Sequence, residues 1–110
     1  MSYNIMVEKL KNKQNVSFRP RGNSMLPIIQ SGNLCTLSPD LQGIGKGDIV
    51  FCKVKGNFYL HKISAIKGEQ FQISNNKGFV NGWINKDKIF GKLISVESWL
   101  KLFNTAINPK

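Results

Sequence analysis

Residues 48–66 read DIVFCKVKGNFYLHKISAI, and this stretch indicates two β-strands joined by a tight turn. Residues 48–54 and 57–66 are rich in β-branched and aromatic side chains, which favour strands. Gly56-Asn57 between them is typical of a hairpin turn that requires positive φ. Alternate residues share one face of each strand, namely Val50, Cys52 and Val54 on the first and Tyr59, His61 and Ile63 on the second. A β-hairpin is therefore predicted at the centre of the chain.

The flanking sequence predicts further short strands and a helix near each end. Strands are expected at residues 16–20, 33–37, 70–74 and 88–96. Residues 3–14 and 97–107 have the apolar spacing of short amphipathic helices, and residues 74–82 are expected to form a loop. These patterns predict an all-β, mainly antiparallel domain with short terminal helices.

The composition favours one small basic domain. A length of 110 residues suits a single domain spanning 1–110, and a hydrophobic content of 41% is too high for a disordered chain. The net charge of +10 is spread along the sequence, so a solvated surface with some attraction for nucleic acid is expected. No stretch approaches the ~18–20 apolar residues that span a bilayer, and no secretory signal follows Met1. We therefore expect a cytoplasmic protein.

The cysteines and the histidine do not form a metal-binding pattern. Cys35 and Cys52 lie on different predicted strands, and His61 is the sole histidine. Two cysteines and one histidine are too few for a structural zinc site, so we expect no metal and no cofactor. Buried thiols are the simplest interpretation of the cysteines in a reducing compartment, although their spacing leaves a disulfide open.

The residues that indicate chemistry occur in short segments along the chain. Residues 22–27 read GNSMLP, and Gly32-Asn33 follows. Gly47-Asp48 opens the next strand, and the strand after it carries His61-Lys62-Ile63. A last strand contains Gly91-Lys92.

This order of segments resembles the serine peptidases of the LexA and signal peptidase I type. The resemblance covers about residues 16–96, with 1–15 as an N-terminal segment and 97–110 as a C-terminal helix or tail. It implies a strongly coiled β-domain in which Ser24 is the nucleophile. Bacterial members use a lysine as the base, whereas membrane-bound signal peptidases of the endoplasmic reticulum and archaea use a histidine. The matching position here is His61.

Lys62 is the alternative base, but strand alternation places it on the opposite face from His61. His61 fits the role because an unperturbed imidazole titrates near neutral pH. The resemblance also implies an oxyanion-binding amide at Ser24. Gly22, Met25 and Pro27 would then lie around the cleft, where packing is an equally good reading of Met25 and Pro27.

The sequence departs from the family pattern at two acidic positions. Asn33 replaces an aspartate after Gly32, and no acid stands where histidine-type members carry the aspartate that orients their base. Asn81 falls near that position and is expected to accept a hydrogen bond from His61 through its amide oxygen. Asp87 is the nearest acid downstream.

Three functions are consistent with these residues. The first is a serine endopeptidase that acts on another protein in trans and takes an extended peptide with small residues around the scissile bond. LexA-type self-cleavage is not expected, because no Ala-Gly or Cys-Gly precedes Ser24. The second is a catalytically degenerate domain that binds nucleic acid or protein. The third is a peripheral membrane or partner contact through the helix predicted to contain Trp99 and Phe103.

Overall fold

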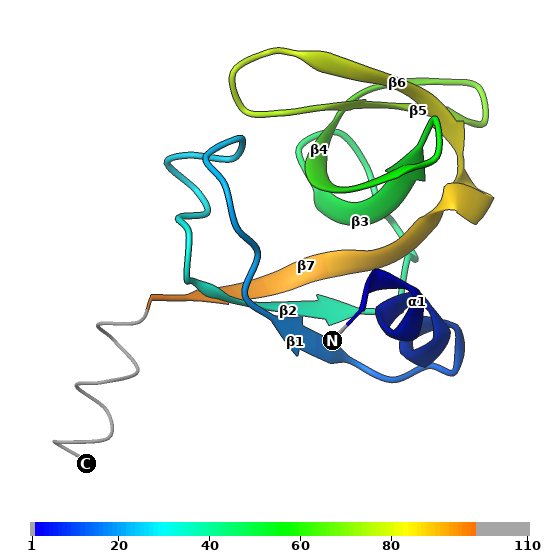
Figure 1. Cartoon of the computed structure of the whole chain (residues 1–110). Helices are drawn as coiled ribbons and strands as arrows, with labels where there is room; N and C mark the ends of the chain where they lie inside the picture. The colour runs from blue at the N-terminus through cyan, green and yellow to red at the C-terminus, as the bar shows by residue number, and fades with distance from the viewer. Residues whose placement is uncertain (1, 99–110) are drawn as a thin grey trace, which may run out of the picture.

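A computed structural model describes residues 2–98 of the chain. The elements in chain order are α1 (Tyr3–Lys11), β1 (Val16–Phe18), β2 (Leu34–Ser38), β3 (Ile49–Val54), β4 (Asn57–Lys67), β5 (Gln70–Ser74), β6 (Val80–Asn85), the 3₁₀ turn η1 (Lys86–Lys88) and β7 (Ile89–Glu97). The seven strands form one antiparallel sheet in the order β1-β2-β7-β3-β4-β5-β6 (Figure 1). The all-β class predicted from the sequence is confirmed.

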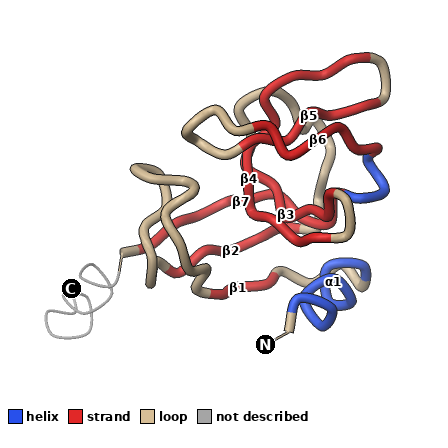
Figure 2. Tube along the Cα trace, turned by 45° about the horizontal axis from the view of Figure 1, so that its top comes forward, coloured by secondary structure: helices blue, strands red, loops and turns tan. Residues whose placement is uncertain are grey.

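The sheet is strongly coiled, so its two ends enclose the core. Strands β1, β2 and β7 lie together below the coil that β3 to β6 form, and Figure 2 shows the same arrangement from another side. β7 pairs with β2 on one edge and with β3 on the other. One core cluster fills the coil; its buried members are Val50, Cys52, Val54, Ile63, Ile73, Ile84 and Ile89.

Helix α1 packs over the opposite end of the sheet. The Ser2 hydroxyl caps it by accepting a hydrogen bond from the Ile5 N–H at 3.2 Å. Met6 and Leu10 are buried against the strands. The close approach requires glycine on β7, because a Cβ at Gly91 would lie 3.1 Å from both Leu10 methyl carbons.

Two details differ from the sequence predictions, and a third prediction falls almost wholly outside the described residues. The central hairpin turns at Lys55-Gly56, which have φ of 50° and 83°, and Asn57 already belongs to β4. The second half of the predicted 74–82 loop is β6, an edge strand with two exposed apolar side chains, Val80 and Trp83. The predicted helix at 97–107 lies outside the described residues, apart from Glu97, which ends β7, and Ser98.

The two cysteines are unpaired and buried. Cys35 and Cys52 belong to different core clusters, which excludes a disulfide between them in this structure. Burial raises the pKa of Cys35 to about 11 and that of Cys52 to about 12. Both thiols are therefore protonated at neutral pH and act as small apolar core residues.

Candidate active site

Ser24 lies in the loop between β1 and β2, which two buried side chains anchor to the sheet. Met25 and Ile29 insert into a core cluster on either side of an exposed turn, and the Ile29 N–H donates to the Met25 carbonyl at 3.0 Å. Gly22 adopts φ of 105°, a conformation that favours glycine, two residues before Ser24. The buried Met25 and Ile29 side chains thus hold the loop that carries the Ser24 hydroxyl against the sheet.

Side-chain hydrogen bonds close the far end of the same loop. The Asn33 amide oxygen accepts the Gln30 N–H at 2.8 Å, and Asn33 is buried. The Arg19 guanidinium donates to the Gly32 carbonyl at 2.6 Å. Asn33 therefore acts as a turn cap, a role in which a neutral amide oxygen serves as well as the carboxylate of the family pattern.

His61 lies on β4, opposite Val50 of the neighbouring β3. Only 6% of the residue is exposed. The Tyr59 ring stacks against the imidazole with centroids 4.9 Å apart and an interplanar angle of 29°. The strand backbone and this stacking restrict the ring to one orientation, which is a requirement for a positioned general base.

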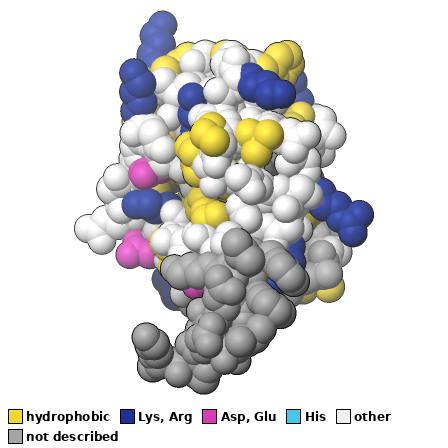
Figure 3. Space-filling view, turned by 90° about the vertical axis from the view of Figure 1, so that its left-hand side faces the viewer, with side chains coloured by type: hydrophobic (Ala, Val, Ile, Leu, Met, Phe, Trp, Pro, Cys, Tyr) yellow, Lys and Arg dark blue, Asp and Glu magenta, His cyan; other side chains and the backbone are white. Residues whose placement is uncertain are grey.

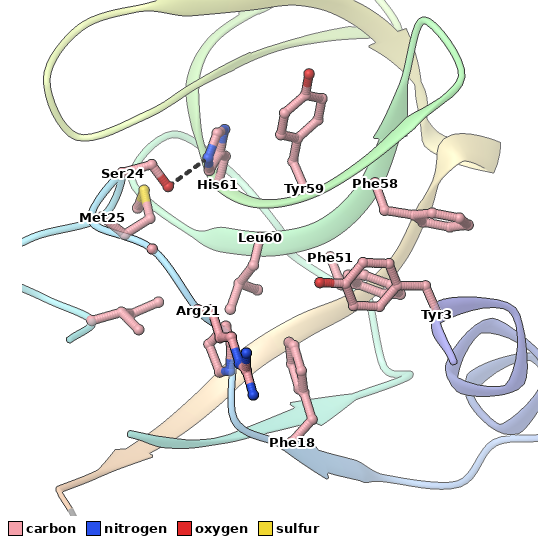
Figure 4. A pocket seen from close by; sticks show the side chains of 13 residues that line it. Tyr3, Phe18, Arg21, Ser24, Met25, Phe51, Phe58, Tyr59, Leu60 and His61 are labelled. Carbon is pink, nitrogen blue, oxygen red and sulfur yellow. Dashed lines mark hydrogen bonds between the residues drawn. The ribbon is translucent and has the colours of Figure 1, made fainter. Parts of the chain in front are cut away.

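The structure brings Ser24, His61 and Asn81 into one hydrogen-bonded chain. His61 Nε2 lies 3.0 Å from Ser24 Oγ, the contact drawn as a dashed line in Figure 4. His61 Nδ1 lies 2.7 Å from Asn81 Oδ1. Because an amide oxygen only accepts, Nδ1 carries the proton in this arrangement, and Nε2 of the neutral ring is free to accept from Ser24.

The surroundings keep the imidazole neutral. Burial lowers the pKa of His61 below its ordinary 6.5, and the hydrogen bond to Asn81 opposes this effect only in part. At neutral pH His61 is therefore an unprotonated base whose free nitrogen faces the Ser24 hydroxyl.

Asn76 joins the β5–β6 loop to the Ser24 loop, a contact that the sequence analysis missed. The Asn76 N–H donates to the Ser24 carbonyl at 2.9 Å, and its side-chain amide donates to the Leu26 carbonyl, also at 2.9 Å. Asn75 stabilises the same loop by accepting from the amides of Lys77 and Phe79 at 2.9 Å. The Asn75-Asn76 pair was the available signal, because asparagine side chains in a loop commonly hydrogen-bond to the backbone.

Other charged residues of the matched segments are structural. The Asp48 carboxylate accepts the Gly45 N–H at 2.8 Å and lies 3.8 Å from the Lys92 ammonium. The Gly47-Asp48 and Gly91-Lys92 segments thus meet at the β3–β7 junction. Asp87 is exposed in η1, and within residues 2–98 the hydrogen-bond partner of His61 Nδ1 is Asn81.

A pocket of about 140 Å³ lies beside Ser24 and His61. Its walls come from α1, the chain after β1, the Ser24 loop and the β3–β4 hairpin; the lining residues are Tyr3, Phe18, Pro20, Arg21, Gly22, Ser24, Met25, Ile29, Phe51, Phe58, Tyr59, Leu60 and His61 (Figure 4). Gly22 and Met25 line this pocket as the resemblance implied. Pro27 does not, because it lies on the exposed side of the loop after a cis peptide bond.

On the face that carries the Ser24 loop, the described Lys and Arg side chains do not gather into one patch. Figure 3 shows the Lys and Arg side chains scattered around that face, with apolar side chains between them. None of the helices in the described part of the chain has the length and apolar character needed to cross a membrane. Among the same residues no group of three or more His, Cys, Asp or Glu side chains is placed to hold a metal ion.

Comparison with known proteins agrees with the fold. No curated protein matches the sequence. The family described as Peptidase S24-like matches residues 3–94, which include α1, all of β1 to β6 and most of β7. The chain therefore belongs to the Peptidase S24-like family.

Proposed function

We propose that this protein is a serine endopeptidase that cleaves another protein chain, with Ser24 as nucleophile, His61 as general base and Asn81 as the residue that positions His61. The observation that carries the proposal is the chain from Ser24 Oγ through the imidazole to Asn81, with distances of 3.0 and 2.7 Å. A serine hydroxyl needs such an adjacent base, and the base needs a third group to orient it.

The first half of the reaction forms an acyl-enzyme. Ser24 Oγ attacks the carbonyl carbon of the scissile peptide bond while its proton passes to His61 Nε2. Within the described residues no hydrogen bond occupies the Ser24 N–H, so this amide is available to the developing oxyanion. The imidazolium then gives its proton to the leaving nitrogen as the C–N bond breaks, and the amine product departs.

The second half returns the enzyme to its starting state. Water attacks the acyl carbon as His61 Nε2 takes one of its protons, and the ester bond to Ser24 Oγ breaks as that proton returns to the oxygen. The products are a new carboxyl terminus and a regenerated Ser24–His61 pair. Asn81 holds Nδ1–H throughout and stabilises the imidazolium through its amide dipole, without a full negative charge.

Two unpaired strand edges suit an extended substrate. Residues 57–61 of β4 pair with β3 alone, because the pairing of β4 with β5 begins at Lys62. β1 pairs with β2 alone in the described structure. Both segments adjoin the pocket beside His61, so a peptide has backbone donors and acceptors to pair with as an added strand.

The test is cleavage of a library of ten-residue peptides with randomised central positions, read as new termini by mass spectrometry. Wild-type protein should cleave, Ser24→Ala and His61→Ala should not, and Lys62→Met should cleave like wild type. Cleavage that survives in His61→Ala but is lost in Lys62→Met would assign the base to Lys62 and overturn the proposal. Folding of each variant is checked by far-UV circular dichroism.

The neutral partner of His61 supports a second candidate, a peptide-binding module without turnover. Replacing the orienting carboxylate of a Ser-His-Asp triad by an amide lowers kcat by about 10⁴-fold in the chymotrypsin-like case. If the protein is such a binding module, wild type and Ser24→Ala would bind the same peptides with equal affinity, and no new termini would appear. Binding that instead weakens steeply with salt and favours nucleic acid would identify the basic surface as the binding site.

A further inference from the structure

The pocket beside Ser24 and His61 extends to the N-terminal helix, where an aromatic side chain closes it. Tyr3 is the first residue of α1 and lines the end of the pocket opposite Ser24, with its hydroxyl end directed into the space in Figure 4. Its ring centroid lies 5.5 Å from that of Phe58 and 5.7 Å from that of Phe51. Helix α1 thus contributes a wall of the pocket, and this wall lies outside the short motif segments from which the site was predicted.

Aromatic side chains form the floor of this pocket. Phe51 and Phe58 stack at 5.5 Å with an interplanar angle of 11°, and Phe51 is 1% exposed. Phe18 packs on Phe51 at 6.1 Å from the β1 side. Arg21 is the one lining side chain with a permanent charge, and it is exposed at the rim. An apolar group entering the pocket would therefore contact rings without burying a charge.

The volume of the pocket decides the size of that group. At about 140 Å³ the pocket, which is partly open to solvent, is similar in volume to an engineered cavity of about 150 Å³ that binds benzene. A methyl group would leave most of such a space empty, whereas a leucine, methionine or phenylalanine side chain would fill it.

We infer that the pocket is a specificity site for one large apolar side chain of the substrate, within a few residues of the scissile bond, and that Tyr3 determines its depth. This inference rests on the proposed peptidase function. The sequence analysis predicted small substrate residues around the scissile bond. The pocket instead predicts that one substrate residue near this bond is leucine, methionine or phenylalanine. The backbone edges of β4 and β1 hold the peptide, and the aromatic floor selects this side chain.

The experiment begins with the termini produced from the randomised ten-residue library. One position on a fixed side of the scissile bond should be enriched in Leu, Met or Phe. For the best peptide and its alanine-substituted match, kcat/KM should favour the large side chain by at least about 10-fold, the usual contribution of a filled apolar subsite. Equal kcat/KM for the two peptides would overturn the inference and leave the peptidase function in place.

Variants of α1 then assign the selectivity to Tyr3. Tyr3→Ala should reduce the preference to a few-fold, chiefly by lowering kcat/KM for the peptide with the large side chain. Tyr3→Phe should retain the preference, because it keeps the ring that closes this end of the pocket. Ile5→Ala is the matched control, since Ile5 lies on the same helix, is 47% exposed like Tyr3, and does not line the pocket. Loss of selectivity in Tyr3→Phe or in Ile5→Ala would contradict the assignment.

A binding measurement separates failure of the inference from failure of the peptidase function. Ser24→Ala is titrated with the same peptide pair by isothermal calorimetry; if wild type cleaves nothing, the pair is a decapeptide with central leucine and its alanine match. A tighter complex with the large side chain, weakened by Tyr3→Ala in the same background, supports the pocket even without turnover. Equal affinities would reject the pocket whether or not the wild type cleaves.

Discussion

Replacing Asn81 by aspartate should strengthen the general base. In the native structure the amide oxygen of Asn81 accepts from His61 Nδ1 at 2.7 Å. An aspartate is isosteric with asparagine, so Asn81→Asp keeps this hydrogen bond and adds a negative charge beside the ring. The charge stabilises the imidazolium that forms when Ser24 loses its proton, and it raises the pKa of His61 above that of the native protein.

The size of the effect follows from the geometry. Unit charges about 4 Å apart interact by about 4 kcal/mol at an effective dielectric constant of about 20. If the whole interaction were expressed in the transition state, kcat would rise by about 1,000-fold. Position 81 is partly open to solvent, which screens the charge, and we therefore expect an increase of about 10- to 100-fold.

Two measurements check this expectation. His61 is the sole histidine in the sequence, so its imidazole gives a single set of NMR signals whose titration midpoint is read directly. The midpoint should lie higher in Asn81→Asp than in wild type, and kcat on the best library peptide should rise. Asn85→Asp is the matched control, because it adds the same charge at an exposed position of the same strand.

The reasoning would be refuted by coincident titration midpoints of wild type and Asn81→Asp in two folded proteins. That outcome would mean that residue 81 does not contact His61 in solution. A raised midpoint with unchanged kcat would keep the contact but reject His61 as the base in the rate-limiting step.

Four further predictions concern His61, the Ser24 loop and the contact between α1 and β7. Because burial lowers the pKa of His61 below 6.5, the unfolded chain takes up a proton at a higher pH than the folded protein does. The unfolding free energy of wild type should therefore decline below pH 6.5, relative to that of His61→Gln. Urea melts from about pH 7.5 to 5 measure this difference. By the same shift, the acidic limb of the kcat/KM profile should have its midpoint below 6.5. Asn76→Ala removes the hydrogen bond to the Leu26 carbonyl and should lower the unfolding free energy by about 0.5–1.5 kcal/mol in urea melts. Because this change also releases the Ser24 loop, the fractional loss of kcat should exceed the fractional loss of unfolding free energy. Gly91→Ala places a Cβ 3.1 Å from the Leu10 methyls and should lower the unfolding free energy by about 1–3 kcal/mol in the same assay.

Local sequence patterns predicted the strands that carry strong alternation. The predicted bounds of the 70–74 strand match those of β5 at both ends. The predicted bounds of β3, β4 and β7 lie within one residue of the observed ones. β6 was missed because Gly82 and the exposed Trp83 interrupt the alternation on which strand prediction depends. Its pairing with β5, the strand that precedes it in the chain, supplies what the local sequence lacks.

The site was predictable only where motifs mark it. Ser24, His61 and Asn81 were identified from the order of segments, and the structure places all three together. The pocket was not foreseen, because its lining joins residue 3 to residues 18–29 and 51–61. Long-range packing of this kind leaves no periodic trace in the sequence, and Tyr3 looked like an ordinary apolar position of an amphipathic helix.

The position of β7 in the sheet has a consequence for the order in which the protein matures during synthesis. β2 and β3 are neighbours in the chain, yet β7 lies between them and pairs with both. The two halves of the sheet therefore have no shared ladder until residues 89–97 have left the ribosome. Ser24 belongs to one half and His61 to the other, so a nascent chain holds the nucleophile apart from its base until this late, non-local pairing forms. Under the proposed function, proteolytic competence is acquired only once β7 has joined the two halves of the sheet.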